Sequence, residues 1–439
     1  MGCLSRTMKS IHYFSLLLIG LQLHCHCLQG HSDDKESHGD RNSPKYRPPP
    51  LKHQRHEANN WHKILPSNAD FAIRFYKEIA SNTTAKNIFF SPLSISTAFA
   101  LLSLGAKSET LNQIHQGLAF NRSKIEENEI HRGFHQLIHM LNRPNNKAQV
   151  NIGNAVFINE TFKFEPKFLD DVREFYQSEG FSTNFRNSTA AINQIHDYVQ
   201  KKTHGKITHI VEKLEQDTVM FLVNYIFFKA SWIEPFSHFL TREEDFFVDG
   251  NKTVKVDLMY QEGYYKVLHD EDMACWVVEV PYKGDSVAWF ILPDEGKLKH
   301  VEGALAKEDV SKWPTYFRDE FIYLYIPKFN ISASYDLKDL FQRLGVTDVF
   351  SSNADLSGIT SEHPLNASEA SHKAVLNLDE SGTEATAITS IVMAGELSLI
   401  FPPPPSFKFN RPFLLFIVEK ITNSLLFIGK IVNPADKNF

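Results

Sequence analysis

The sequence predicts one α+β domain that follows an export signal and a polar tail. Helical patterns dominate the first half of the chain, and paired apolar strand patterns dominate the second half. No long linker follows Leu65, so the two halves are expected to share one core. The 439 residues include 35 Phe, which predicts a core rich in aromatic packing.

Residues 1–27 have the pattern of a signal peptide. Arg6 and Lys9 precede an apolar stretch, Ile11–Leu23, that is too short to span a bilayer. Cleavage is expected after about Cys27. We therefore predict a secreted, extracellular protein.

Cysteine use and sequons agree with that prediction. Three of the 4 Cys would leave with the signal peptide, and Cys275, inside an apolar run, is expected to pack as a small hydrophobe without a disulfide. Asn-x-Ser/Thr sequons predict N-glycosylation. They lie at Asn82, Asn121, Asn159, Asn187, Asn251, Asn330 and Asn366.

Residues 28–63 form a polar tail, because almost nothing in them is apolar. The second part, from Lys45 to Lys63, is basic, and Pro48–Pro50 make it locally extended. We interpret the tail as a solvated leader; binding of a glycosaminoglycan or another acidic partner is the alternative. Its histidines lack the fixed geometry of a metal site.

Two helices are expected to open the domain. Apolar residues at helical spacing in Phe71–Ile79 predict the first, with Ser67 or Asn68 as its cap. Ser91 and Pro92 have the residue types of an N-cap and a first helical position, and the apolar run after them extends to Leu104. Both helices should be largely buried.

Strands are expected to dominate the second part of the domain. The uninterrupted apolar run Val219–Phe228 predicts a strand covered on both faces. A helix is expected around Ser334–Leu344. Two antiparallel hairpins are predicted, Trp276–Tyr282 with Val287–Leu292 and Phe413–Glu419 with Leu425–Val432.

The sequence does not predict an enzyme or a nucleic-acid binder. The net charge of −6 disfavours nucleic acid, and no nucleophile elbow, phosphate loop, dinucleotide fingerprint or zinc-protease motif occurs. His131, His135 and His139 would share one helical stripe, where two imidazoles can hold a metal. No carboxylate or Cys completes that stripe, so we interpret them as histidines beside an apolar face. No catalytic residue, cofactor, metal or membrane span is predicted.

The segment from Glu380 to Pro405 has an unusual composition. Its start contains Glu380 and Glu384, and the small or β-capable, uncharged run Ala385–Ser390 follows. The segment ends in the four prolines Pro402–Pro405. The first half suits a β-strand, and the exit is fixed in polyproline geometry. Such a segment is either a loop or a strand that has not yet joined a sheet.

A series of short motifs extends from about Leu65 to the C-terminus. They are Asn87–Ser96, Val223–Lys229, Trp232–Phe236, Ile291–Asp294, Ile326–Phe329, Ala354–Ser357, His372–Ala374, Gly382–Ala385, Arg411–Phe413 and Phe427–Pro434. In sequence and in order these motifs resemble the serpin family. The resemblance is to the plasma clade of antitrypsin, antichymotrypsin and the hormone-binding globulins. It implies a single serpin domain over 64–439, with a large central mixed β-sheet, additional sheets, about nine helices and an exposed reactive centre loop at about 380–405.

The resemblance also assigns roles to single residues. Ser91, Ser94, Asn224 and His372 match a polar cluster that governs opening of the central sheet, and Trp232 matches the point where the loop first enters. The hinge matches Glu380, Gly382, Thr383, Glu384, Ala385, Thr386 and Ala387. Alternate hinge side chains are small and uncharged, so the resemblance implies a loop that can insert.

The resemblance implies suicide inhibition of a serine protease. The target protease is the expected partner, and the protein is expected to be a monomer. The scissile bond is placed at Leu397-Ser398, which suits chymotrypsin- or elastase-like enzymes, with Glu396-Leu397 as the alternative register. A non-inhibitory serpin that carries a hormone or another small hydrophobic ligand is the alternative function. Ile388, where the family usually has Ala, favours that alternative.

Overall fold

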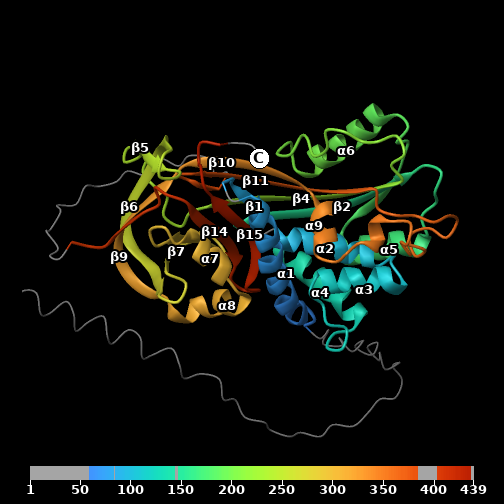
Figure 1. Cartoon of the computed structure of the whole chain (residues 1–439), viewed down its shortest axis with the longest axis horizontal. Coiled ribbons are helices and arrows are strands. Elements are labelled where there is room, and N and C mark those ends of the chain that lie inside the picture. The colour runs from blue at the N-terminus through green and yellow to red at the C-terminus, as the bar shows by residue number, and fades with distance from the viewer. Residues whose placement is uncertain (1–58, 84, 144–146, 384–402, 437–439) are drawn as a thin grey trace, which may run out of the picture. The chain divides into compact units, whose positions relative to one another are not determined.

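The computed structural model describes residues 59–83, 85–143, 147–383 and 403–436. They belong to one compact unit, Glu57–Phe439, built from two sheets and the helices that pack on them (Figure 1). The predicted signal peptide, the tail up to residue 58 and loop residues 384–402 lie outside the described residues. None of the helices in the described ranges has the length and apolar character needed to cross a membrane.

The described residues contain nine α-helices and one 3-10 turn. They are α1 Trp61–Asn82, α2 Pro92–Ser103, α3 Ser108–Gly117, α4 Glu127–Leu141, α5 Pro166–Tyr176, α6 Ser188–Lys202, α7 Leu298–Ala304, α8 Lys307–Tyr316, α9 Leu337–Arg343 and η1 Asp348–Phe350. This agrees with the number that the family resemblance implied.

A six-stranded mixed sheet lies at the centre, in the order β10-β11-β12-β4-β2-β3. Its strands are β2 Gln149–Asn159, β3 Glu179–Thr183, β4 Met220–Ser231, β10 Phe329–Asp336, β11 Glu369–Asp379 and β12 Gly382–Thr383. Helix α6 covers one face of β2 and β4, and α2 and α4 pack on the other face (Figure 1). The central strands are therefore buried on both sides.

A second, nine-stranded sheet follows the order β1-β15-β14-β8-β7-β6-β9-β13, and β5 pairs with β6. Its strands are β1 Ile88–Phe90, β5 Arg242–Phe247, β6 Thr253–Asp270, β7 Cys275–Pro281, β8 Ser286–Pro293, β9 Arg318–Pro327, β13 Ser406–Lys408, β14 Phe413–Glu419 and β15 Ser424–Ile431. Strands β13 and β12 bracket the undescribed loop residues. The α+β class and the mixed central sheet are confirmed.

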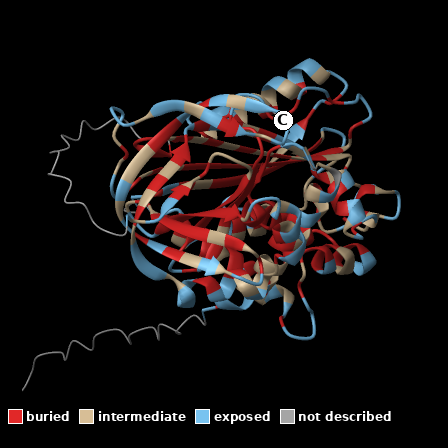
Figure 2. Cartoon of the chain, turned by 60° about the vertical axis from the view of Figure 1, so that its left-hand side comes forward, coloured by how far each residue is buried: buried red, intermediate tan, exposed pale blue. Residues whose placement is uncertain are grey.

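The predicted strands agree closely with the structure. Strand β4 is almost wholly buried, and the hairpins β7–β8 and β14–β15 pair in antiparallel register. Burial is concentrated where these strands meet the helices (Figure 2). Cys275 is a free, buried cysteine at the start of β7, and burial raises the pKa of its thiol to about 12.

The start of the first helix was predicted too late. Helix α1 begins at Trp61, within the segment assigned to the tail, and Pro66 lies inside it. Neither Ser67 nor Asn68 is its cap. The first turns form because the side chain of Ile64 is fully buried, and because the backbone N–H of Trp61 donates to Gln136 Oε1 at 3.2 Å. Packing on α4 overrides the helix-breaking tendency of proline.

The predicted helix at 334–344 was placed slightly early. Residues 334–336 belong to strand β10, and α9 begins at Leu337. Asp336 caps the helix, since its carboxylate accepts from the backbone N–H of Lys338 at 2.9 Å. The strand continues because residues 329–336 all pair with β11.

Candidate functional site

The candidate site is a slot between β4 and β11 in the central sheet. Residues 369–375 of β11 pair directly, in parallel, with residues 221–227 of β4. Further along, the two strands separate, and the short strand β12 lies between them, antiparallel to both. Strand β12 thus runs toward the seam where β4 and β11 still pair.

Strand β12 contains the first two hinge residues that face the slot. Thr383 pairs with Ala230 of β4 and Leu378 of β11, and its side chain is fully buried. Its Oγ1 lies 2.9 Å from Tyr282 Oη. The backbone approaches β4 so closely at Gly382, where φ is +137°, that a Cβ there would lie 2.3 Å from Ala230 O. Only glycine is accommodated at that position.

Trp232 lies at the end of β4 and holds the turn before β12. Its backbone N–H donates to Ser381 O, and its indole N–H donates to Asp379 O, each at 3.0 Å. The indole stacks on Tyr282 with ring centroids 4.2 Å apart. Trp232 therefore contacts the hinge, as the resemblance implied for the entry point of the loop.

Glu380 anchors the same turn through its carboxylate. Oε2 accepts from Lys328 Nζ at 3.0 Å, and Oε1 accepts from Thr241 Oγ1 at 2.9 Å. Burial alone would raise the pKa of Glu380, but hydrogen bonds from its own backbone N–H, Lys328 and Thr241 outweigh burial and hold the pKa below its usual value. The hinge carboxylate is therefore charged and paired near neutral pH.

A buried polar cluster crosses the seam where β4 and β11 still pair. His372 of β11 lies opposite Asn224 of β4 in the register, and His372 Nδ1 is 2.5 Å from Asn224 Oδ1. The backbone N–H of Ser91 donates to His372 Nε2 at 3.2 Å, so the imidazole proton resides on Nδ1 and is donated to Asn224. Burial lowers the pKa of His372 to about 3, and the ring is neutral. We call Ser91, Ser94, Asn224 and His372 the seam cluster.

The start of α2 completes the seam cluster. Ser91 caps the helix, because its Oγ accepts from the backbone N–H of Ser94 at 3.1 Å. Asn224 Nδ2 donates to Ser94 O at 2.9 Å and to Asn154 Oδ1 at 2.6 Å. The cluster therefore ties both strands of the seam to one helix terminus.

The structure brings together most of the predicted residues that it describes, in two groups. Four form the seam cluster, while Trp232 lies at the other end of β4 with Glu380, Gly382 and Thr383. The hinge residues Glu384, Ala385, Thr386 and Ala387 and the bond residues Glu396, Leu397 and Ser398 lie outside the described residues. Sequence reasoning assigned no role to four contributors, of which only Lys328 lies in one of the family motifs: Asn154, Thr241, Tyr282 and Lys328.

The remaining candidate residues lie away from the slot. His131 Nδ1 is 2.6 Å from Tyr176 Oη, and His135 Nδ1 is 2.7 Å from Glu174 O, so both bond to protein groups on or beside α5. In the described ranges, no cluster of three or more His, Cys, Asp or Glu side chains is arranged to hold a metal. Among the sequon asparagines, four are exposed: Asn121, Asn187, Asn251 and Asn330. Asn159 and Asn366 are half-buried, and the side chain of Asn82 is not described.

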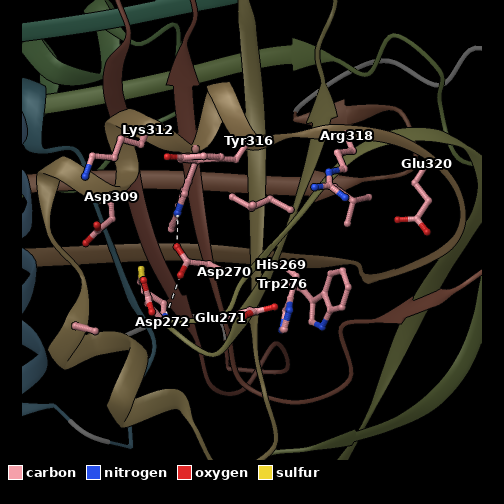
Figure 3. A pocket seen from close by; sticks show the side chains of 15 residues that line it. His269, Asp270, Glu271, Asp272, Trp276, Asp309, Lys312, Tyr316, Arg318 and Glu320 are labelled. Atoms are coloured by element: carbon pink, nitrogen blue, oxygen red, sulfur yellow. Dashed lines mark hydrogen bonds between the residues drawn. The ribbon is translucent and has the colours of Figure 1, made fainter.

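A cavity of about 770 Å³ lies elsewhere, between α8 and the end of β6 (Figure 3). Asp270, Glu271 and Asp272 line one side and Tyr316 the other. The Asp270 carboxylate accepts from Trp313 Nε1 at 2.9 Å. Its lining mixes carboxylates with Lys312, Arg318 and apolar side chains, and it is open to solvent at Tyr316.

Comparisons with known proteins cover most of the chain. The family model described as "Serpin (serine protease inhibitor)" matches residues 66–434. Alpha-1-antiproteinase 2 of Equus caballus is 48% identical over 376 residues, 86% of this chain and 88% of that protein. Alpha-1-antitrypsin of Sus scrofa is 46% identical over 385 residues, covering 88% and 90%.

Solved structures agree with this result. Human thyroxine-binding globulin, complexed with its hormone, superposes with a TM-score of 0.81 at 40% identity and covers 86% of this chain and 100% of that one. Human glycosylated kallistatin gives a TM-score of 0.79 at 44% identity, with coverage of 85% and 99%.

Proposed function

The chain belongs to the serpin family, and from this premise we propose that it is a secreted inhibitor that traps serine proteases by inserting its loop into the slot. Membership of this family, with antiproteinases among the relatives, supports protease inhibition, and the protein is not an enzyme. The trapping mechanism, the secretion and the class of target belong to the proposal.

The observation that carries the proposal is the position of Thr383. This hinge residue is already paired on both sides, to β4 and to β11, and its side chain is buried. Further strand residues would extend β12 along the seam, with alternate side chains facing the same packed side as Thr383. The sequence supplies Ala385, Ala387 and Thr389 at those alternate positions, all small and uncharged. This composition supports insertion.

The chemistry that starts insertion would be supplied by the protease. Its serine attacks the carbonyl of Leu397, the Leu397–Ser398 peptide bond breaks, Ser398 leaves as a free amine, and Leu397 stays on the protease as an ester. The freed strand then inserts before water cleaves the ester. Trapping requires a native state held by a kinetic barrier.

The seam cluster is the barrier that the geometry suggests. A strand that enters between β4 and β11 increases their separation from about 4.8 Å to roughly twice that distance. The bond between His372 and Asn224 cannot survive this change, because its two residues lie directly opposite each other. Insertion must therefore break the cluster, and the cluster opposes insertion until the loop is cut.

Further parts of the proposal rest on the sequence. The target is a chymotrypsin- or elastase-like protease, the inhibitor is a monomer, and the exposed sequons carry glycans. Binding of a glycosaminoglycan to the basic tail remains a secondary prediction.

Transport of a hormone is the alternative function. It is favoured by the similarity to human thyroxine-binding globulin, whose solved structure contains thyroxine. The cavity beside α8 does not add to that case, because charged side chains of both signs make up much of its lining, whereas pockets for apolar ligands are mainly apolar.

The decisive experiment mixes the full chain with chymotrypsin and examines the products on a denaturing gel. An inhibitor gives a complex that survives SDS, whereas chymotrypsin with a blocked catalytic serine gives none. Cleavage of the loop between Gly382 and Pro402 should also raise the thermal unfolding midpoint, since insertion relieves the metastable sheet. A cleaved chain with no complex and an unchanged midpoint would support the carrier function instead.

A further inference from the structure

The hinge carboxylate of Glu380 has a third partner whose charge depends on pH. His238 Nδ1 lies 3.3 Å from Glu380 Oε1. The Glu380 side chain is only 3% exposed, whereas that of His238 is 52% exposed, so solvent protons reach the imidazole and not the carboxylate. The contact becomes an ion pair only when His238 is protonated.

We infer that His238 is a positioning residue of the hinge, and that its protonation tightens the hold of Glu380 on the turn between β11 and β12. The expected effect of His238 on inhibition rests on the proposed function. The expected effect of His238 on the stability of the native fold does not depend on that function.

Three other charged groups lie on the elements around this contact. Lys328, between β9 and β10, bonds Oε2. Arg242, at the start of β5, donates to the carbonyl oxygens of Phe239 and Thr241 on the same turn as His238. Asp379, at the end of β11, adds a second carboxyl group, and burial raises its pKa. Because imidazoles usually change charge between pH 5 and 8, substitution of His238 decides whether a response in that range depends on this side chain.

The turn held by Glu380 is the fixed end of the strand that would insert. Phe236 N–H donates to Glu380 O at 2.8 Å, and β12 starts two residues later. A firmly held turn leaves fewer conformations for the residues after it, so insertion loses less conformational entropy. Protonated His238 should therefore favour insertion over completion of the protease reaction.

Three substitutions separate charge from shape. His238→Gln keeps a polar side chain without charge, and His238→Lys carries a permanent charge. His139→Gln is the matched control, since His139 lies exposed on α4. Unfolding midpoints of the full chain at one scan rate, and the number of inhibitor molecules consumed per chymotrypsin inactivated, are measured at about pH 5.5 and about pH 8. Each variant is compared with the parent at the same pH. The titration of the protease and of the other histidines is then common to both measurements and cancels.

At about pH 5.5 the unfolding midpoint of the parent should lie about 1–2 °C above that of His238→Gln. About two-fold fewer molecules of the parent than of His238→Gln should be consumed per chymotrypsin inactivated. Both differences should vanish near pH 8. His238→Lys should keep the acidic behaviour at both pH values, and His139→Gln should follow the parent. Equal pH dependence in the parent and His238→Gln would overturn the inference. If the unfolding midpoints change as expected but no variant inhibits chymotrypsin, the contact between His238 and Glu380 would stand and the proposed function would be rejected.

Discussion

Tyr282 Oη and Thr383 Oγ1 lie 2.9 Å apart in the interior, although 101 residues separate them in the sequence. Tyr282 directly follows β7 of the nine-stranded sheet, and Thr383 lies in the slot of the central sheet. One hydrogen bond thus connects the hinge to the neighbouring sheet. Burial raises the pKa of Tyr282 above its usual value, so the hydroxyl stays neutral.

Removing this hydroxyl should loosen the hinge. Tyr282→Phe keeps the ring that stacks on Trp232 but leaves Thr383 Oγ1 without its partner in the slot. A lost buried hydrogen bond of this kind costs about 1–3 kcal/mol. Hydrogen exchange should therefore become faster at the backbone amides of Thr383 and Ala230.

Tyr335→Phe is the matched control for that measurement. Tyr335 is also buried, but its hydroxyl accepts from the backbone N–H of Phe89, and its ring lies beside His372 of the seam cluster and not at the hinge. It should lower stability without changing exchange at the hinge. Unchanged exchange at Thr383 in Tyr282→Phe would show that β-pairing alone holds the hinge.

A charged side chain at Thr383 should convert the inhibitor into a substrate. Thr383→Arg places a guanidinium between β4 and β11, where burial without a partner costs several kcal/mol. The loop would then be cleaved without trapping the protease. Gels should show cleaved chain and little SDS-stable complex, while Thr315→Arg, at an exposed position of α8, should behave as the parent. Parental complex yield in Thr383→Arg would contradict insertion.

Acid should destabilise the native fold through His372. Its pKa falls to about 3 in the folded protein, below the usual value of about 6.5 that the unfolded chain retains. The unfolded chain therefore binds a proton that the folded chain refuses, and stability decreases as pH falls from about 6.5 toward about 3. At pH 5 the loss is on the order of 2 kcal/mol.

Unfolding curves at several pH values measure this effect. His372→Gln should be less stable than the parent at neutral pH but should lose less stability between about pH 6.5 and pH 4. His300→Gln, at an exposed position, should retain the parental slope. Parallel slopes in His372→Gln and the parent would assign the acid sensitivity to other groups.

Local patterns predicted the secondary structure well because burial follows periodicity. Val219–Phe228 reads as a strand covered on both faces, and β4 is that strand. The start of α1 was predicted too late because local sequence was misleading there. Pro66 and the polar tail argue against a helix, and the burial of Ile64, which favours one, depends on tertiary packing that the local sequence does not show.

The candidate site divides in the same way. Family resemblance identified His372 and Thr383, because their motifs are local in the sequence. Tyr282 and Thr241 were missed, since each meets the hinge only after distant parts of the chain have packed together. His238 carries no motif, and its significance appears only beside the buried Glu380.

The bond that the protease cuts can be decided by comparing two neighbouring residues, both outside the described range. Leu397 would gain roughly 2 kcal/mol on entering an apolar S1 pocket. An ionised Glu396 would instead lose several kcal/mol of hydration unless the protease supplied a cation. Leu397→Ala should therefore slow association with chymotrypsin- or elastase-like enzymes far more than Glu396→Ala. Mass spectrometry of the peptide released from the complex should find Ser398 at its N-terminus. A peptide that begins at Leu397 would make Glu396 the recognised residue and indicate an acid-selective protease, and one that begins at Ala394 would assign that role to Met393 and contradict both registers.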